Sequence, residues 1–244
     1  MAKTVVLVHG AWHGAWCFGP VLELLQDSGI DAVAVDLPGH GDDPGPFTDL
    51  IGDAAAVEAT LDALATDGRA DEGVVLLGHS YGGCVITQAG LHPAVAHLVY
   101  LCAFAIDDAE SAATAGAEAE GISHEGRPNL GHAFVFADDG TTTLEPVGAA
   151  DCLYNLCDDD TVTWALERIG AQPVANFMQS PTKVAWRERP STYVVCAEDM
   201  GIHPDLQRIL AKRCSTSVEW ATGHSPFASH PHLVADFLTM LATD

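Results

Sequence analysis

A serine in the first half of the chain has the neighbours that an activated nucleophile requires. Ser80 lies in the pentapeptide GHSYG (78–82), which directly follows the apolar run VVLL (74–77). Such a run predicts a buried strand, and a helix is expected to begin near Tyr81. The glycines at both ends of the pentapeptide leave space for a sharp turn that exposes the serine oxygen. We therefore predict that Ser80 is a nucleophile.

A serine hydroxyl needs a base that removes its proton, and the base needs an acid that fixes its tautomer. His224 follows the last strand-like run and precedes a predicted helix, so its imidazole could reach Ser80. Asp199 follows the strand-like run before that one. Serine, acid and histidine in this chain order are typical of the α/β-hydrolase fold. Three other carboxylates remain alternatives for the acid: Glu198, Asp107 and Asp108.

Acyl transfer also needs hydrogen-bond donors for the oxyanion. The residues after the first strand-like run, HGAW (9–12), predict a tight turn. That turn would direct the backbone amide of Ala11 toward the same point as the amide of Tyr81, which follows the nucleophile. We predict these two amides as the oxyanion donors, although an ordinary strand-to-helix turn would have the same sequence.

Charge and cysteine content exclude several classes of protein. Ten Lys and Arg residues against 34 Asp and Glu residues give the 244-residue chain a formal net charge of −24, which repels nucleic acids and anionic membrane surfaces. Seven cysteines without close spacing do not indicate a disulfide framework and favour a reducing compartment. The first apolar run is too short for a signal peptide, and no run approaches the ~18 residues of a membrane span. We expect a cytoplasmic protein.

Strand-like apolar runs alternate with helical patterns along most of the chain. The expected strands are Thr4–Val8, Ile30–Val35, Gly73–Leu77, Leu98–Cys102, Thr192–Cys196 and Ser217–Trp220. The expected helices of this region are Trp16–Ser28, Leu50–Leu64, Tyr81–Leu91, His203–Arg213 and Pro226–Leu241. This alternation predicts an α/β fold with a six-stranded, mostly parallel sheet and helices on both faces. Catalytic groups should then meet at the carboxyl ends of the strands.

One long segment, residues 107–189, interrupts that alternation. It holds an Ala/Glu/Gly-rich run (Ser111–Gly121), two β-favouring pieces (His132–Phe136 and Thr141–Leu144) around an Asp-Asp-Gly turn, and a helix from Thr161 to Ile169. The turn predicts a hairpin. We interpret residues 107–189 as an inserted cap over a core of residues 1–106 and 190–244. Residues expected in an apolar substrate pocket are Trp12, His13, Trp164, Phe177 and Met178.

No metal or cofactor is expected. The acidic run Asp158-Asp159-Asp160 precedes a predicted helix, where acids cap backbone amides. His230 and His232 flank a proline and lack further zinc ligands nearby. The glycines at 39, 41 and 45 do not have the spacing of a dinucleotide-binding loop.

Six blocks of sequence resemble a branch of the α/β-hydrolases that includes plant methylesterases, bacterial relatives and hydroxynitrile lyases. The blocks are HGAWHGAW (9–16), DLPGHG (36–41), GHSYGG (78–83), LYNLC (153–157), ED (198–199) and GHSP (223–226). The resemblance spans essentially the whole chain. It implies a six-stranded core, a cap between the fourth and fifth strands, and Ser80, Asp199 and His224 as a catalytic triad.

The chain departs from the lyases of this branch at three positions. Those lyases carry a lysine after the catalytic histidine, and usually a threonine in the oxyanion turn and a glutamate before the serine. Here the corresponding residues are Ser225, Ala11 and His79. Without a cation beside the base, a departing cyanide has no counter-charge, so the sequence favours ester hydrolysis.

The predicted activity is therefore that of a serine esterase, which cleaves a small, apolar or aromatic carboxylic ester through an acyl-serine. A hydroxynitrile lyase-like or other non-hydrolytic enzyme remains an alternative, as does a ligand-binding protein on the same fold. An epoxide hydrolase or dehalogenase would need an aspartate in place of Ser80. The expected partner is a small-molecule substrate, and whether the chain forms a homodimer is left open.

Overall fold

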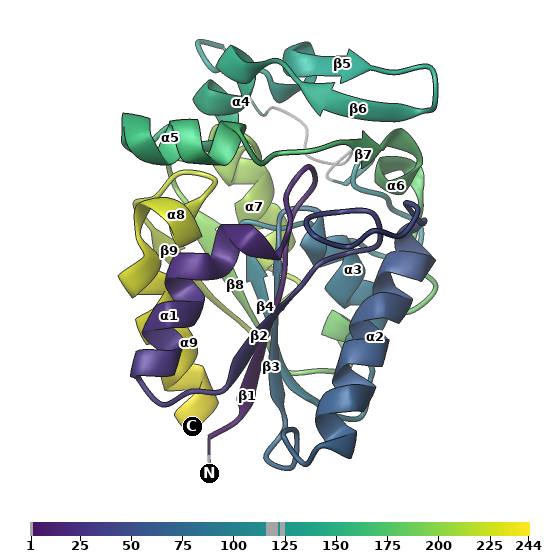
Figure 1. The fold of residues 1–244 in the computed structure, drawn as a ribbon, viewed down its shortest axis with the longest axis vertical. Helices are drawn as coiled ribbons and strands as arrows, with labels where there is room; N and C mark the ends of the chain where they lie inside the picture. Colours follow the sequence, from purple (N-terminus) through teal and green to yellow (C-terminus); the bar gives the residue numbers. More distant parts are fainter. Residues whose placement is uncertain (1, 116–121, 123–124) are drawn as a thin grey trace.

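A six-stranded parallel sheet forms the centre of the molecule (Figure 1). The computed structural model describes residues 2–115, 122 and 125–244. The strand order is β2-β1-β3-β4-β8-β9, and every neighbouring pair in this sheet is parallel. The strands are β1 (Thr4–Val8), β2 (Ala32–Val35), β3 (Val74–His79), β4 (Val95–Leu101), β8 (Ser191–Cys196) and β9 (Thr216–Trp220). All six predicted strands are therefore present, with small differences at their ends.

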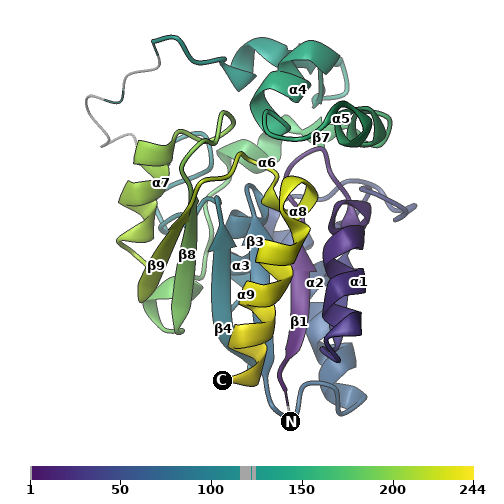
Figure 2. The ribbon, with the colours of Figure 1, turned by 90° about the vertical axis from the view of Figure 1, so that its left-hand side faces the viewer.

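Helices cover both faces of the sheet (Figure 2). One face packs against a group that includes α1 (Gly19–Asp27) and α9 (Pro231–Thr243), and the other against α2 (Leu50–Thr66), α3 (Gly82–Ala89) and α7 (Pro204–Ala211). The two apolar cores follow from the alternation of side chains along each strand. In β1, for example, Val5 and Leu7 pack on the α1 side, whereas Val6 and Val8 pack on the α2 side.

The C-terminal helical region differs from the prediction of one continuous helix. It forms two helices, α8 (Pro226–Ser229) and α9, separated by His230. Proline disfavours helical backbone at the residue before it and has no amide to continue a helix. His230 has φ of −139° and ψ of 53°, which is outside the helical region, and α9 begins directly at Pro231.

The segment between β4 and β8 lies over the carboxyl ends of the core strands, at the top of Figure 1. The predicted hairpin is confirmed: β5 (Phe134–Phe136) and β6 (Thr141–Leu144) pair antiparallel. The predicted helix is α5 (Asp159–Leu166), and Asp158 caps it by accepting the Thr161 amide over 2.8 Å. The sequence did not predict α4 (Pro146–Leu153), β7 (Gln172–Pro173) or α6 (Val174–Met178). Residues 116–121 of the Ala/Glu/Gly-rich run lie outside the described residues.

Short 3₁₀ helices complete the fold at Ala15–Phe18, Leu130–Ala133 and Ala185–Arg187. Within the described ranges, no helix has both the length and the apolar character needed to cross a lipid bilayer.

Candidate active site

Ser80 lies at the sharp turn between β3 and α3. Its φ of +51° is in the left-handed region that side chains rarely adopt. The turn depends on its flanking glycines, because a Cβ on Gly78 would lie 2.4 Å from the Gly82 carbonyl oxygen, and one on Gly82 would lie 2.5 Å from the Val8 oxygen. The strained turn directs the Ser80 side chain into a cavity above the carboxyl ends of the strands.

His224 and Asp199 form a buried hydrogen-bonded pair next to this turn. His224 Nδ1 lies 2.8 Å from Asp199 Oδ2, and the two side chains are only 2% and 0% exposed. The Asp199 carboxylate also accepts hydrogen bonds from the Gly201 amide at 2.7 Å, the Ile202 amide at 2.9 Å and the Gln207 side chain at 2.7 Å. These donors hold the carboxylate in one orientation. His224 Nδ1 therefore carries a proton toward Asp199, and Nε2 is the nitrogen able to act as a base.

The alternative acids lie elsewhere or have other partners. Asp107 forms an ion pair with Arg187, and so does Asp108 at 3.5 Å. Glu198 accepts the Asn155 side chain through its backbone oxygen, and Asp199, not its neighbour, reaches the imidazole. The structure thus pairs His224 with the carboxylate that the sequence favoured.

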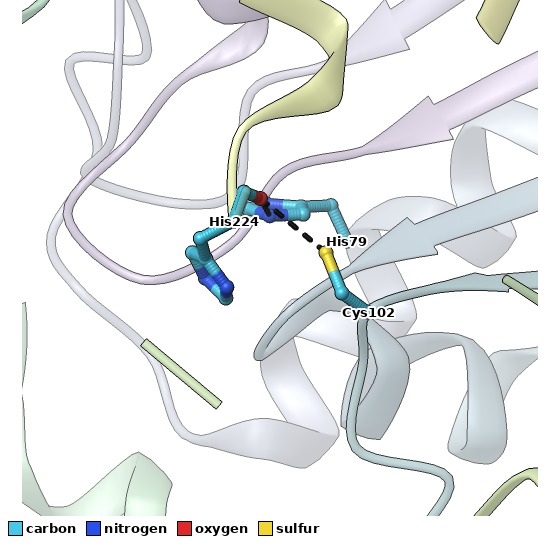
Figure 3. A group of neighbouring side chains, drawn as sticks. All are labelled: His79, Cys102 and His224. Atoms are coloured by element: carbon cyan, nitrogen blue, oxygen red, sulfur yellow. Dashed lines mark hydrogen bonds between the residues drawn. The ribbon is translucent and has the colours of Figure 1, made fainter. Parts of the chain in front are cut away.

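Two side chains that the sequence analysis did not assign hold the backbone of His224. His79 Nε2 donates to the His224 carbonyl oxygen over 2.8 Å, and the Cys102 thiol donates to it over 3.3 Å (Figure 3). His79 ends β3 and Cys102 follows β4, so the two central strands fix the loop that carries His224. The position of His79 directly before Ser80 is a sequence signal for a role near the site. The sequence does not reveal that its hydrogen-bond partner is the His224 carbonyl.

His79, Cys102 and His224 also have potential metal-ligand atoms within 4.8 Å of one another. Their chemistry does not fit a metal site. Figure 3 shows the His224 imidazole turned away from Cys102 while its carbonyl faces the thiol. Burial raises the pKa of the Cys102 thiol well above its usual value and lowers that of His79. Both groups therefore stay neutral, and the thiolate that a metal would bind is disfavoured.

The predicted oxyanion donors face the same cavity as Ser80. Ala11 and Tyr81 both line it, and among the described residues neither backbone amide has a hydrogen-bond acceptor. Trp12, directly after Ala11, has φ of +64°, which produces the tight turn expected after β1. Gly10 allows this turn to approach Ser80, because a Cβ there would lie 2.8 Å from Ser80 Cβ.

Two neutral histidines support the loop that carries Ala11. His9 Nδ1 donates to the Gly10 oxygen over 2.8 Å, and its Nε2 accepts the Leu37 amide over 3.1 Å. His13 Nδ1 donates to the Ala11 oxygen over 2.7 Å. Burial is the main cause that lowers the pKa of His9 to about 3 and that of His13 to about 4. Both rings are thus neutral near pH 7 and act as fixed hydrogen-bonding groups.

The LYNLC block connects the segment above the sheet to two loops of the site. The Tyr154 hydroxyl donates to His13 Nε2 over 2.6 Å and so reaches the oxyanion turn. The Asn155 amide donates to the Glu198 carbonyl over 3.0 Å, beside the acid. This block therefore holds the cap against both loops.

A polar network lies behind Ser80. The Tyr81 hydroxyl donates to the buried Asp53 carboxylate of α2 over 2.8 Å, and Asn176 of α6 donates to the same oxygen over 2.9 Å. The Thr48 hydroxyl donates to the other Asp53 oxygen over 2.6 Å. Desolvation raises the pKa of Asp53. The network links α2, the turn at Ser80 and α6, and it was not predicted from the sequence.

The cavity at Ser80 has a volume of about 190 Å³ and mostly apolar walls. Beyond Ser80, His224, Ala11 and Tyr81, it is lined by Trp12, Phe104, Ala112, Ala113, Leu130, Phe134, Phe177, Gly201 and Ile202. Of the expected pocket residues, Trp12 and Phe177 line this cavity. His13 and Trp164 do not: His13 lies beneath the oxyanion turn, and Trp164 packs edge-on against Trp16 with ring centroids 5.1 Å apart. Met178 is 62% exposed.

Comparison with known proteins agrees with this architecture. A model of the alpha/beta hydrolase family matches residues 5–237. The chain belongs to this family. It is 30% identical over 249 residues to alpha/beta hydrolase nvfD of Aspergillus novofumigatus, covering 96% of this chain and 94% of the relative. It is 28% identical over 262 residues to methylesterase 1 of Arabidopsis thaliana, covering 97% and 95%.

Solved structures of the same fold superpose on this hydrolase over its whole length. A pyrethroid hydrolase from Sphingobium faniae has a TM-score of 0.82 at 24% identity, with coverage of 100% of this chain and 98% of that chain. Polyneuridine aldehyde esterase has a TM-score of 0.81 at 21% identity, with both chains covered completely. The family match and the similarity to methylesterase 1 fit the methylesterase-like branch of the alpha/beta hydrolases.

Proposed function

We propose that this alpha/beta hydrolase cleaves a small, apolar or aromatic carboxylic ester through an acyl-serine intermediate. One observation carries the proposal: one apolar cavity is bordered by a strained serine, by an imidazole that a buried carboxylate holds, and by two backbone amides without acceptors among the described residues. The residues in these roles are Ser80, His224, Asp199, Ala11 and Tyr81. The esterases among its relatives support the same class of reaction.

The first half of the reaction forms the acyl-enzyme. Ser80 Oγ attacks the ester carbonyl carbon while His224 Nε2 takes the hydroxyl proton. Asp199 stabilises the resulting imidazolium, and the amides of Ala11 and Tyr81 donate to the oxyanion of the tetrahedral intermediate. The bond to the alcohol oxygen then breaks as His224 returns its proton to that oxygen. Water repeats the sequence on the acyl-serine and releases the acid.

The immediate neighbour of the base favours hydrolysis over cyanohydrin cleavage. Ser225 is buried and neutral, and the described lining of the cavity contains no Lys or Arg. A departing cyanide would therefore meet no cation at the base. An alcohol leaving group needs only the proton that His224 carries.

A panel of methyl, aryl and lactone esters, with intact-mass detection of the enzyme, tests the proposal. We expect a mass increase equal to the acyl group on Ser80, and Ser80→Ala should lower kcat by roughly five to six orders of magnitude while keeping the fold. Thermal unfolding and circular dichroism of the variant are the control for folding. A decrease below tenfold would contradict the proposal, as would release of an aldehyde without acylation or ligand binding without turnover.

A further inference from the structure

A second cavity adjoins the one at Ser80 and has a different character. Its volume is about 240 Å³, and its lining is more polar. The two cavities share Leu130 and Gly201 in their walls. Gly201 contributes only backbone there, and it lies against the catalytic pair: a Cβ on it would be 3.0 Å from His224 Cγ. The second cavity is therefore on the His224 side of the site.

If the proposed ester hydrolysis is correct, the location of the second cavity on the His224 side determines which part of the ester lies near each cavity. The alcohol oxygen must receive its proton from His224, so the alcohol part of the ester lies on the His224 side of Ser80. The acyl part then occupies the apolar cavity lined by Trp12 and Phe177. The polar cavity beyond Gly201 is adjacent to the alcohol part.

The side chains of the polar cavity present hydrogen-bond donors. Arg127 is half-buried and positively charged, and one of its Nη atoms donates to the Asp199 carbonyl oxygen. Asn129 accepts the Gly131 amide through Oδ1 at 2.9 Å, which leaves its NH₂ group on the other side.

The second cavity has a positively charged side chain in its lining, although the molecule as a whole is strongly acidic. The chain has only 10 Lys and Arg residues against 34 Asp and Glu residues, yet none of the described residues that line this cavity is acidic. Arg127 also forms no ion pair with any described residue, whereas other arginines, such as Arg69 and Arg208, are paired with carboxylates. A guanidinium with unused donors binds a carboxylate through two parallel hydrogen bonds.

We infer that the polar cavity binds the alcohol part of the substrate, and that it selects alcohols that carry a carboxylate close to the ester oxygen. One cation, Arg127, and the neutral side-chain amide of Asn129 match a singly charged carboxylate. The preferred substrate class is thus an ester of an apolar or aromatic acid with a short hydroxy acid. Arg127 is a specificity residue in this assignment, and it also touches the loop of Asp199.

Three phenyl-containing esters separate this inference from a general preference for anions. Carboxymethyl phenylacetate has the carboxylate in the alcohol part, and carbamoylmethyl phenylacetate is its neutral match. Benzyl hydrogen malonate is an isomer of the first ester, with the carboxylate moved to the acyl part. For the wild-type enzyme we expect the KM of the first ester to be about tenfold lower than that of either other ester.

Variants then test the residue. Arg127→Gln should raise the KM of carboxymethyl phenylacetate about tenfold more than that of the carbamoyl ester, and Arg127→Lys should recover part of the loss. Arg69→Gln removes one positive charge beside the amino end of β1 and is the matched control for net charge. It should change neither KM by more than about twofold, as expected for an exposed ion pair.

The outcomes distinguish the two proposals. Equal KM values for the charged and neutral esters in the wild type would overturn the inference, and ester hydrolysis would stand. The same KM increase for both esters in Arg127→Gln would assign Arg127 a structural role at the Asp199 loop and would also overturn it. An Arg127 effect as large on the malonate isomer would contradict the placement of the alcohol part. Failure of these three esters and of the methyl, aryl and lactone esters to acylate Ser80 would overturn the proposed function itself.

Discussion

The carboxyl ends of the core strands and the segment that covers them contribute to the same cavity in different ways. The core holds its functional groups with several short hydrogen bonds each: the Asp199 carboxylate has two backbone donors and the Gln207 side chain in addition to His224. The cap mostly supplies walls, and parts of it are open to solvent: Val135, Phe136 and Val147 are 42%, 67% and 74% exposed. Changes in the core should therefore affect the rate for every ester, whereas changes in the cap should affect affinity for some.

The largest expected effect comes from the buried acid of the core. Asp199→Asn keeps the shape of the side chain but presents an NH₂ or a neutral oxygen to His224, so the imidazole loses its fixed tautomer. We expect kcat to fall about 10⁴-fold, as for the same change in a Ser-His-Asp triad, with little change in KM. Glu198→Gln, on the adjacent residue, is the matched control and should change kcat less than threefold. Similar losses for both variants would contradict the role of Asp199.

The next effect concerns the stability of the core beneath the oxyanion turn. The folded-state pKa values of His9 and His13 are about 3 and 4, below the ordinary value of 6.5, so the unfolded chain binds more protons between pH 6.5 and 4. Their contribution to stability is present above pH 6.5 and is lost as the pH falls toward 4. From pH 7 to pH 5 each histidine should lower the free energy of unfolding by about 2 kcal/mol.

Urea unfolding at pH 7, 6 and 5 measures this loss. His13→Gln removes one of the two groups, and its stability should therefore depend less steeply on pH than that of the wild type. His132→Gln, at an exposed position, should keep the wild-type slope. An unchanged slope in His13→Gln would show that His13 does not stay neutral in the folded state.

The contrast between the core and the cap also explains which features could be predicted from the sequence. The six strands were predictable because each is an apolar run whose alternate side chains enter two cores, as Val5 and Val6 do in β1. The turn at Ser80 was predictable because only glycine fits on either side of it. The apolar runs and the glycine spacing are both local features of the sequence, and each reflects a requirement of the nearby backbone.

Contacts between distant segments left no local signal. The hydrogen bond from His79 to the His224 carbonyl joins residues 145 positions apart, and that from Asn176 to Asp53 spans 123 positions. In the cap, α6 has only five residues, too few to show a helical pattern. Trp164 was expected in the pocket because it is aromatic, but its ring packs on Trp16 and Arg168. The composition of such a segment does not reveal which way its side chains point.

The polar network at Asp53 connects α2 of the core with α6 of the cap. A substitution there tests how the core and the cap are coupled, with a smaller expected effect. Asp53→Asn replaces an acceptor of several hydrogen bonds with a group that also donates, which leaves buried hydroxyls badly paired. We expect the free energy of unfolding to fall by about 1–3 kcal/mol. Asp67→Asn, at the exposed end of the same helix, should change it by less than about 0.5 kcal/mol.

Activity measured on the Asp53 variant separates two roles of the network. If it positions the Tyr81 amide, kcat should fall for every ester, because the oxyanion donor moves. If it only fastens α6, KM should rise and kcat should remain. A variant as stable as the wild type would contradict any contribution of the network.

The smallest expected effect lies in the cap and distinguishes two of its aromatic residues, Phe177 and Trp164. Phe177 lines the cavity at Ser80, and Trp12 packs against it with ring centroids 5.5 Å apart. Phe177→Ala should raise the KM of an aryl ester about tenfold, since roughly 1.4 kcal/mol of apolar contact is lost, with little effect on a methyl ester of a short acid. Trp164 lies outside this cavity, so Trp164→Ala should change KM less than twofold. Steady-state kinetics on both esters decides the matter: equal effects of the two variants would mean that the cap acts on affinity through its overall packing, and that the cavity wall at Phe177 does not select the substrate.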